Sequence, residues 1–236
     1  VILLLALILS YTRAAWLSVV FAAGIGFLML MKVPFRWVLV SGLLLGGTTY
    51  YFLDDIQISL NRNKKESSDK MDEHIKSISN VSSDASNLER LNRWHCAMEL
   101  FNQRPIVGWG PGTYQFVYAP FQRAEDRTII STNRGDGGNA HSEYLGPLAE
   151  QGVFGSLIFI ALVLMVCFLG FRVFYGATNY EERLVVMGLF LGLITYFVHG
   201  VLNNFLEMDK IAVPFWAAIA YLVHLDLRKK EGGLTT

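Results

Sequence analysis

Four stretches of the 236-residue chain contain no Asp, Glu, Lys or Arg, and they constrain the fold more than any other feature. They are residues 14–31, 37–53, 152–171 and 184–206. About 20 apolar residues of α-helix, each rising 1.5 Å, cross the hydrocarbon core of a bilayer. Each stretch has close to that length, so a soluble globular protein is excluded. Charged residues make up 17% of the chain, against about a quarter in soluble domains.

The order of apolar and polar segments predicts an all-α membrane protein, a polytopic transmembrane helix bundle with a large outward-facing helical loop. In sequence order, we expect transmembrane helices in 1–53, the loop in 54–140, transmembrane helices in 141–227 and a tail in 228–236. The last apolar run, 211–225, is short and contains Pro214. The first run, 1–9, is too short to cross and lacks the features of a signal peptide. We interpret it as the end of a membrane helix, with further helices expected upstream.

Positive charge in the short links predicts the orientation. If every run crosses, one side of the membrane carries Lys32, Arg36, Arg172, Arg183, Arg228, Lys229 and Lys230. The short links on the other side carry only Arg13 and Lys210. Since cytoplasmic loops carry the excess of Lys and Arg, we expect the tail in the cytoplasm and the loop 54–140 outside.

Composition and motifs exclude several classes of protein. The chain has 20 Lys and Arg against 20 Asp and Glu, so it lacks the basic excess of a nucleic-acid binder. Its two cysteines, Cys96 and Cys167, are too few for a disulfide framework. The sequence contains no P-loop, GxGxxG, HExxH, paired CxxC or Asp-x-Asp motif. No metal site and no cofactor are therefore expected.

The outward loop has two parts. Residues 61–87 are Ser-rich and lack aromatic side chains, which is typical of a surface helical excursion or of a disordered segment. Residues 88–104 carry apolar side chains at helical spacing, namely Leu88, Leu91, Trp94, Met98 and Phe101. This pattern predicts an amphipathic helix that lies against the membrane and ends before a glycine-rich turn. The aromatic residues at 114–121 are also expected on the membrane surface.

Polar side chains on the outward side form the candidate site. Arg90 and Arg93 are three residues apart on the expected helix, so they share one face. Arg13 lies at the outer end of a span, and His141 comes just before an apolar segment. Arginine offers a planar fork of donors to phosphate oxygens, and a neutral histidine accepts a proton from a hydroxyl. This set of residues suits a lipid diphosphate and an acceptor hydroxyl.

Each of these residues also has a structural interpretation. A lone arginine at the end of a span, such as Arg13, is most often a snorkelling anchor. Arg90 and Arg93 also suit the solvated face of a helix, and His141 suits a loop or a helix cap. His199 is the one ionisable group expected deep in a span, where it is either functional or hydrogen-bonded between helices.

Three motifs together resemble the O-antigen ligase and polymerase family of bacterial membrane glycosyltransferases. The first motif is Arg90, Trp94, Ala97, Phe101, Pro105, Gly108, Gly110 and Gly112. The second is His141-Ser142 followed by Gly152 and Gly155-Ser156. The third and weakest is Thr12-Arg13-Ala14. The resemblance covers roughly residues 10–160.

The resemblance implies a multi-pass enzyme of the bacterial inner membrane with its active site facing the periplasm. It would transfer a glycan from an undecaprenyl-diphosphate carrier to an acceptor hydroxyl without a metal. By the resemblance, the catalytic residues are Arg13 and Arg90, which would hold the diphosphate, and His141, which would act on the acceptor. We also expect substrate contacts from Arg93, Trp94 and Ser142, with Arg93 added from its helical spacing rather than from the family.

The acceptor stays open among a lipid A core sugar, a growing glycan and a protein. The matching activities are an O-antigen ligase, a polymerase and a protein O-oligosaccharyltransferase, all with membrane lipids as partners and none with nucleic acid. A non-enzymatic glycolipid transporter is the alternative from a different class. A transporter needs polar groups along a path through the membrane, and only His199 is expected deep in a span.

Overall fold

The computed structural model describes residues 2–9, 12–51, 85–127, 131 and 138–232. Within these residues the secondary structure is helical and contains no strand, which confirms the predicted all-α fold class. Most of the Ser-rich segment 61–87 lies outside the described residues.

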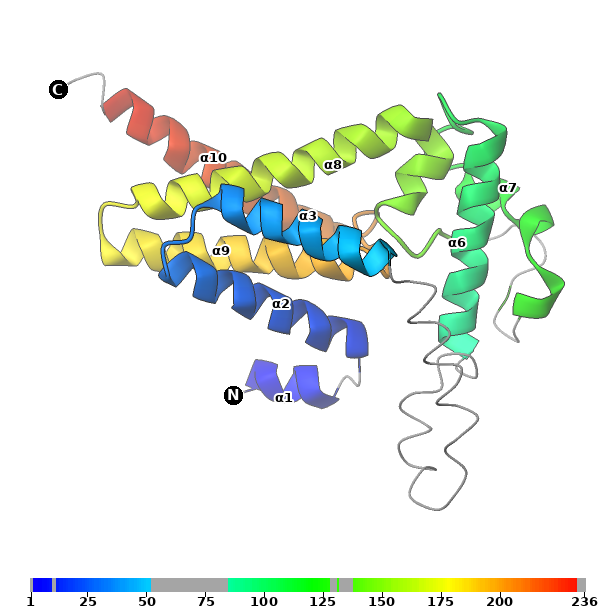
Figure 1. Cartoon of the computed structure of the whole chain (residues 1–236), viewed down its shortest axis with the longest axis horizontal. Helices are drawn as coiled ribbons and strands as arrows, with labels where there is room; N and C mark the ends of the chain where they lie inside the picture. The colour runs from blue at the N-terminus through cyan, green and yellow to red at the C-terminus, as the bar shows by residue number, and fades with distance from the viewer. Residues whose placement is uncertain (1, 10–11, 52–84, 128–130, 132–137, 233–236) are drawn as a thin grey trace, which may run out of the picture.

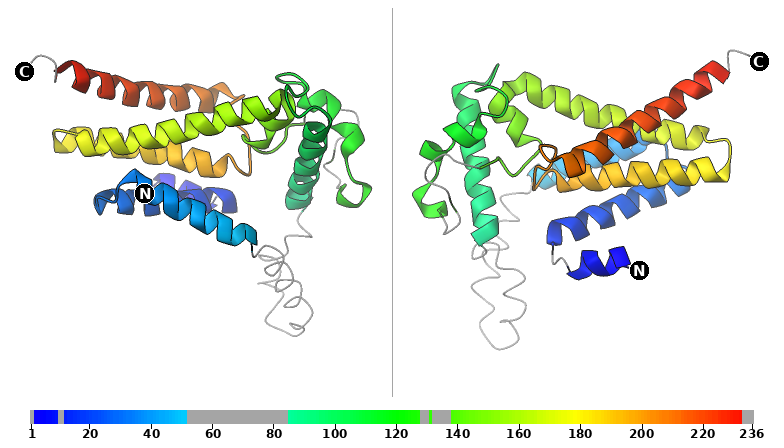
Figure 2. Two further views of the ribbon diagram at one scale, coloured as in Figure 1. Left: turned by 45° about the horizontal axis from the view of Figure 1, so that its top comes forward. Right: turned by 180° about the vertical axis from the view of Figure 1, so that it is seen from behind.

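An elongated bundle of helices lies next to one crosswise helix (Figure 1). The bundle helices are α2 (Arg13–Leu30), α3 (Phe35–Tyr51), α8 (Leu145–Gly176), α9 (Tyr180–His199) and α10 (Asp209–Gly232), with the short α1 (Ile2–Leu9) beside α2. The crosswise helix is α6 (Ala85–Gln103), followed by α7 (Tyr114–Val117) and two 3₁₀ turns, η1 (Ala119–Phe121) and η2 (Ala124–Asp126). In both views of Figure 2, α6 lies across the end of the bundle that is remote from the C-terminus.

The bundle helices have the length and composition of membrane spans. Three of the described helices are long and apolar enough to cross, at Leu145–Gly176, Tyr180–His199 and Asp209–Glu231. Two shorter apolar helices cover Ala14–Leu30 and Phe35–Thr48. The chain is therefore a multi-pass membrane protein.

The bundle core is closely packed because small residues let the helices approach. α2 packs along α9, and α8 packs on both α9 and α10. Gly170 of α8 lies under the ring of Phe190 of α9, where an added Cβ would come within 2.2 Å of the ring. The Phe190 ring also meets Phe171 edge to face at 5.7 Å. Phe171, Phe190, Met29, Leu222, Val173 and Val186 are all at most 2% exposed.

A kink at Gly152 divides α8 into a short arm, residues 145–151, and a long membrane-spanning part. Gly152 has φ 67° and ψ −159°, a conformation open essentially only to glycine. The Val153 N–H, just after the kink, donates to the Pro105 carbonyl at 2.8 Å. A Cβ on Gly152 would lie 2.4 Å from the Ile106 oxygen, so the kink is where α8 meets the turn after α6 backbone to backbone.

The glycine-rich turn makes the same kind of contact from its own side. Gly108 has φ +65°, and a Cβ there would lie 2.3 Å from the Glu150 carbonyl carbon. The Gly110 N–H donates to the Glu150 carbonyl at 2.7 Å. Gly108 and Gly110 of the first motif and Gly152 of the second therefore form the two sides of one close backbone contact.

The face of α6 that packs inside the protein carries mostly small and polar side chains. Its buried residues are Glu89, Asn92, Arg93, Cys96, Ala97 and Leu100. Leu91 and Met98, predicted on the apolar face, are 46% and 41% exposed. The aromatic segment expected on the membrane surface supplies Tyr114 and Tyr118, which are buried and stacked at 5.3 Å. The helix thus packs on backbone and aromatic rings through small and polar side chains, and contact of its exposed apolar residues with the membrane stays a prediction.

One expected span is shorter than its apolar run. α9 ends at His199, whereas the charge-free run continues to residue 206. The chain turns at Gly200, whose N–H donates to the Tyr196 carbonyl at 2.7 Å. The placement of His199 inside a span was therefore wrong, because apolar residues after it form a packed link rather than helix.

We expect Gly152→Ala to destabilise the protein by on the order of 2–4 kcal/mol, since it combines a strained backbone with a steric clash. The matched control is Gly188→Ala in α9, where an added Cβ meets nothing within 4 Å. That change should be neutral or stabilise the helix by up to about 1 kcal/mol. Thermal unfolding in detergent measures both variants, and equal melting of the two would contradict the proposed contact.

Candidate functional site

α6 and the segment 138–144 bring Arg90, Arg93, Trp94 and His141 together at the end of the bundle. His141 has a positive φ of 49°. Its N–H donates to Asn139 Oδ1 at 3.2 Å, and its carbonyl accepts from Trp94 Nε1 at 3.3 Å. Trp94, predicted as a substrate contact, thus holds the backbone of His141 against α6.

Arg93 is buried inside this site. It is 3% exposed, and its Nε donates to Glu89 Oε1 at 2.6 Å. Its guanidinium carbon lies 3.9 Å from the centroid of the Tyr118 ring. A Cβ on Gly138 would lie 1.6 Å from Arg93 Nη1, so the chain leading to His141 passes directly over the guanidinium. Arg93 therefore contributes charge and supports the loop from within.

The surroundings of His141 lower the pKa of its imidazole ring. Burial is the largest cause that lowers its pKa, followed by the positive charges of Arg93 and then Arg90, while the Glu89 charge opposes them. An imidazole with a lowered pKa is neutral near pH 7 and free to accept a proton. The arrangement thus places a proton acceptor next to two cations.

The start of α2 meets the same region. Arg13 is the first residue of α2, and the backbone of its neighbour Ala14 lies near the His199 side chain at the end of α9. The charge of Arg90 also acts on His199. His199 Nε2 lies 3.1 Å from Asn203 Nδ2. All three motifs of the sequence therefore converge at one end of the bundle.

Ser142 has a structural role in the residues described. Its side chain is buried, and its Oγ accepts hydrogen bonds from the N–H groups of Tyr144 and Leu145, both at 3.3 Å. Leu145 is the first residue of α8, so Ser142 satisfies donors that a helix start leaves open. Its contact with substrate stays a prediction.

Glu143 was missed by the sequence analysis. Its Oε1 accepts the N–H groups of Phe205 at 2.6 Å and Leu206 at 2.9 Å, together with the Tyr196 hydroxyl. Its own N–H donates to the Gly200 carbonyl at 2.8 Å. The residue two positions after His141 therefore fastens the link between α9 and α10. An acidic residue at the entrance to an apolar run was the only available signal.

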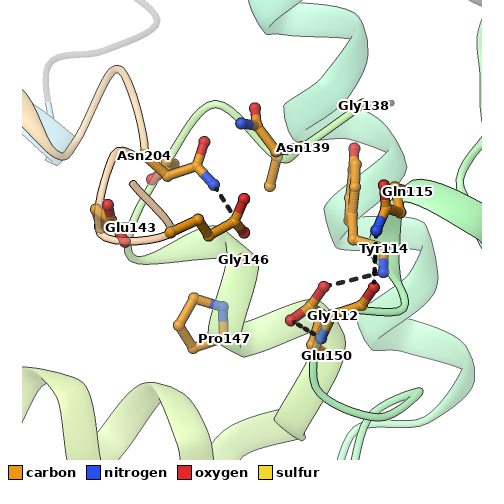
Figure 3. A pocket seen from close by; sticks show the side chains of 13 residues that line it. Gly112, Tyr114, Gln115, Gly138, Asn139, Glu143, Gly146, Pro147, Glu150 and Asn204 are labelled. Carbon is orange, nitrogen blue, oxygen red and sulfur yellow. Dashed lines mark hydrogen bonds between the residues drawn. The ribbon is translucent and has the colours of Figure 1, made fainter. Parts of the chain in front are cut away.

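A polar cavity of about 530 Å³ opens beside the His141 segment (Figure 3). Its polar lining includes Gln115, Asn139, Glu143, Glu150, Asn204 and Glu207, and among the residues that the structure describes no Lys or Arg lines it. Glu150 accepts from the N–H groups of Gly112 at 2.8 Å and Tyr114 at 2.9 Å, as Figure 3 shows. Asn139, Ala140 and Ser142, the neighbours of His141, also line it. The cavity is thus negative, whereas the arginines of the site lie outside its lining.

The pKa of Glu207 is raised above its ordinary value in this cavity. Burial is the main cause that raises its pKa, and the charges of Glu150 and Glu143 add to it. Asn204 Nδ2 lies 3.5 Å from Glu207 Oε1, and the Asn204 Oδ1 atom is buried without a hydrogen-bond partner among the described residues. These groups can therefore form hydrogen bonds with hydroxyl groups of a bound molecule. In the part of the chain that the structure describes, no group of three or more His, Cys, Asp or Glu is placed to hold a metal ion.

Comparison with protein families identifies the chain. The family model described as O-antigen ligase matches residues 1–160. The chain belongs to the O-antigen ligase family. The matched range contains all three motifs and their residues in the site, and family membership makes the chain a membrane glycosyltransferase of the ligase or polymerase type. No significant match is found among curated proteins or among solved structures.

We expect the pKa of His141 to lie below its ordinary value of about 6.5. Arg90→Gln removes a positive charge and should raise it, while Glu89→Gln removes a negative charge and should lower it further. NMR titration of ring-labelled histidine in detergent, with the resonance assigned through His141→Gln, measures all three. A wild-type pKa above 6.5, or shifts of the opposite sign, would contradict the electrostatic assignment.

Proposed function

We propose that this protein transfers a glycan from an undecaprenyl-diphosphate carrier to an acceptor hydroxyl, at the periplasmic face of the bacterial inner membrane. One observation carries the proposal. In a chain of the O-antigen ligase family, a half-buried His141 with a lowered pKa lies within the electric field of two arginines. The reaction needs both features, namely a neutral base and positive charge beside the leaving group.

The donor diphosphate is assigned to Arg90 and Arg13. Arg90 lies on α6 beside His141, and Arg13 begins α2 at the same end of the bundle. Arginine binds phosphate oxygens through paired hydrogen bonds. Arg93 is given an indirect part, since its Nε is bound to Glu89 and its guanidinium lies against Tyr118. Its charge adds to the field while it holds the loop in place.

The acceptor is assigned to the cavity in Figure 3. The cavity borders the His141 segment, and amide and carboxylate groups line it. Such groups exchange hydrogen bonds with sugar hydroxyls, and the carboxylates repel anionic groups. We therefore assign the pocket to an uncharged or amino-bearing sugar rather than to a phosphorylated one.

The transfer step follows from these assignments. His141 takes the proton of the acceptor hydroxyl while the hydroxyl oxygen forms a bond to the anomeric carbon of the donor sugar. The bond from that carbon to the diphosphate oxygen breaks, and undecaprenyl diphosphate leaves with the electron pair. Arg90 and Arg13 stabilise the negative charge that develops on the leaving group.

Three acceptors remain compatible with this step, as the sequence analysis left them. A lipid A core sugar gives an O-antigen ligase, a growing glycan gives a polymerase, and a protein hydroxyl gives an O-oligosaccharyltransferase. The transporter alternative has less support, because the ionisable groups of the site lie at one end of the bundle instead of along a path through it.

The test is glycan transfer by the full-length protein, in proteoliposomes and in cells that lack their own ligase. His141→Ala should reduce transfer by on the order of 10²–10⁴-fold with donor still bound. Arg90→Lys should reduce it by on the order of 10²-fold, because lysine lacks the planar fork. The matched control is Arg123→Lys, an exposed arginine outside the site, which should retain activity.

The location of the product decides among the acceptors. Long-chain glycan on lipid A core indicates a ligase, longer carrier-linked glycan indicates a polymerase, and glycosylated protein indicates an oligosaccharyltransferase. Full transfer by His141→Ala would remove the base assignment. Donor movement across the membrane without any transfer would favour the transporter.

We expect Asn204→Leu to raise the KM for the acceptor by about tenfold and to leave the KM for the donor unchanged, since it removes hydrogen-bonding groups from the cavity alone. The matched control is Asn102→Leu near the end of α6, which is exposed and does not line the cavity. Steady-state kinetics with each substrate varied in turn separates the two effects. A rise in the KM for the donor instead would show that the cavity binds the donor and not the acceptor.

A further inference from the structure

A second cavity lies at the opposite end of the bundle from α6, and the proposed transfer does not use it. Its volume is about 610 Å³. It lies between the link from α2 to α3, the last turns of α8 and the first turn of α9. Three cationic residues, Lys32, Arg172 and Arg183, line it, and none of the described residues that line it is acidic.

The link between α2 and α3 is held in place on this cavity. Lys32 has a positive φ of 59°, and its N–H donates to the Met29 carbonyl at 3.0 Å. The next residue, Val33, accepts a hydrogen bond at its carbonyl from the Tyr175 hydroxyl of α8 at 2.7 Å. Lys32 is therefore presented on a tight turn that is fixed to α8.

The three cations retain binding capacity for an anion. Arg172 pairs with Asp226, but the same carboxylate also lies 3.3 Å from Lys230, so two cations share one anion. The guanidinium carbon of Arg183 lies 5.7 Å from the centroid of the Phe174 ring, which covers one face of its plane. In the described part of the chain, neither Lys32 nor Arg183 has a carboxylate within ion-pair distance.

The remaining wall of the cavity is apolar and continues onto the outside of the bundle. The Phe35 ring lies 5.5 Å from Phe171 and 6.2 Å from Phe168, in tilted and edge contacts. Phe168 and Leu30 also line the cavity and are 51% and 62% exposed. An apolar strip thus leads from the cations along the membrane-facing surface of α2 and α8.

We propose that this cavity binds an anionic phospholipid. Its phosphate group lies between Lys32 and Arg183, with Arg172 beside them, and its acyl chains lie along Phe168 and Leu30. Charge complementarity carries the assignment, since a basic pocket between membrane helices at the end of their spans suits an anionic head group. Because Lys32 and Arg183 come from different elements, the lipid would bridge the α2–α3 link to α9.

The test uses native mass spectrometry on the delipidated full chain in neutral detergent. Phosphatidylglycerol and phosphatidylcholine with identical acyl chains are offered in equal amounts. We expect the anionic lipid to be retained about tenfold more. Lys32→Gln/Arg183→Gln should reduce its retention to that of phosphatidylcholine. The matched control, Arg36→Gln/Arg228→Gln, removes the same charge from exposed residues that do not line the cavity and should keep the preference.

Three results would overturn the proposal. They are equal retention of both lipids by the wild type, unchanged preference in the cavity variant, and equal loss in the control variant. A further measurement adds inorganic phosphate, which should leave the lipid bound. Complete displacement of the lipid would identify a free-phosphate site instead. The wild-type preference does not depend on any variant folding, and it does not depend on glycan transfer.

Discussion

The contact between two glycine turns holds the candidate site together. Gly108 faces the Glu150 backbone and Gly152 faces the Ile106 backbone, each too closely for a side chain. A membrane helix and a crosswise outer helix are thereby joined without any long side chain between them. Close backbone approach fixes geometry more tightly than flexible side chains, because each extra ångström would break hydrogen bonds such as that from Val153 to Pro105. The position of His141 relative to Arg90 depends on this backbone contact between α8 and the turn after α6.

The fold class was predictable because the bilayer imposes one simple requirement. Runs without charge must be helices when water is absent, so the spans could be read from the sequence. The ends of the spans were less predictable, as His199 shows. The residues after it are apolar, yet Glu143 draws their N–H groups into a packed link. Nothing local in the sequence tells a short buried link from one more turn of helix.

The candidate site was predictable in its residue types and less so in their roles. Motif spacing selected Arg90, Trp94 and His141, and helical spacing added Arg93; the structure brings the four together. The role of each residue depends on how deeply its side chain is buried, which the spacing of residues in the sequence does not predict. Arg93 lies beneath the loop while Trp94 holds its backbone. The acidic cavity was not anticipated, because its lining comes from three separate parts of the chain.

The two arginines beside His141 have a consequence for the order of events. Burial lowers the pKa of the imidazole most, and the charges of the two arginines lower it further, so the ring is a weak base before the donor binds. A bound diphosphate would neutralise that field and make the same ring a stronger base. In the proposed reaction, binding of the donor therefore makes His141 a stronger base, and His141 then activates the acceptor hydroxyl that attacks the donor. When the carrier departs with its charge, the ring reverts and releases the proton it has taken, ready for another cycle.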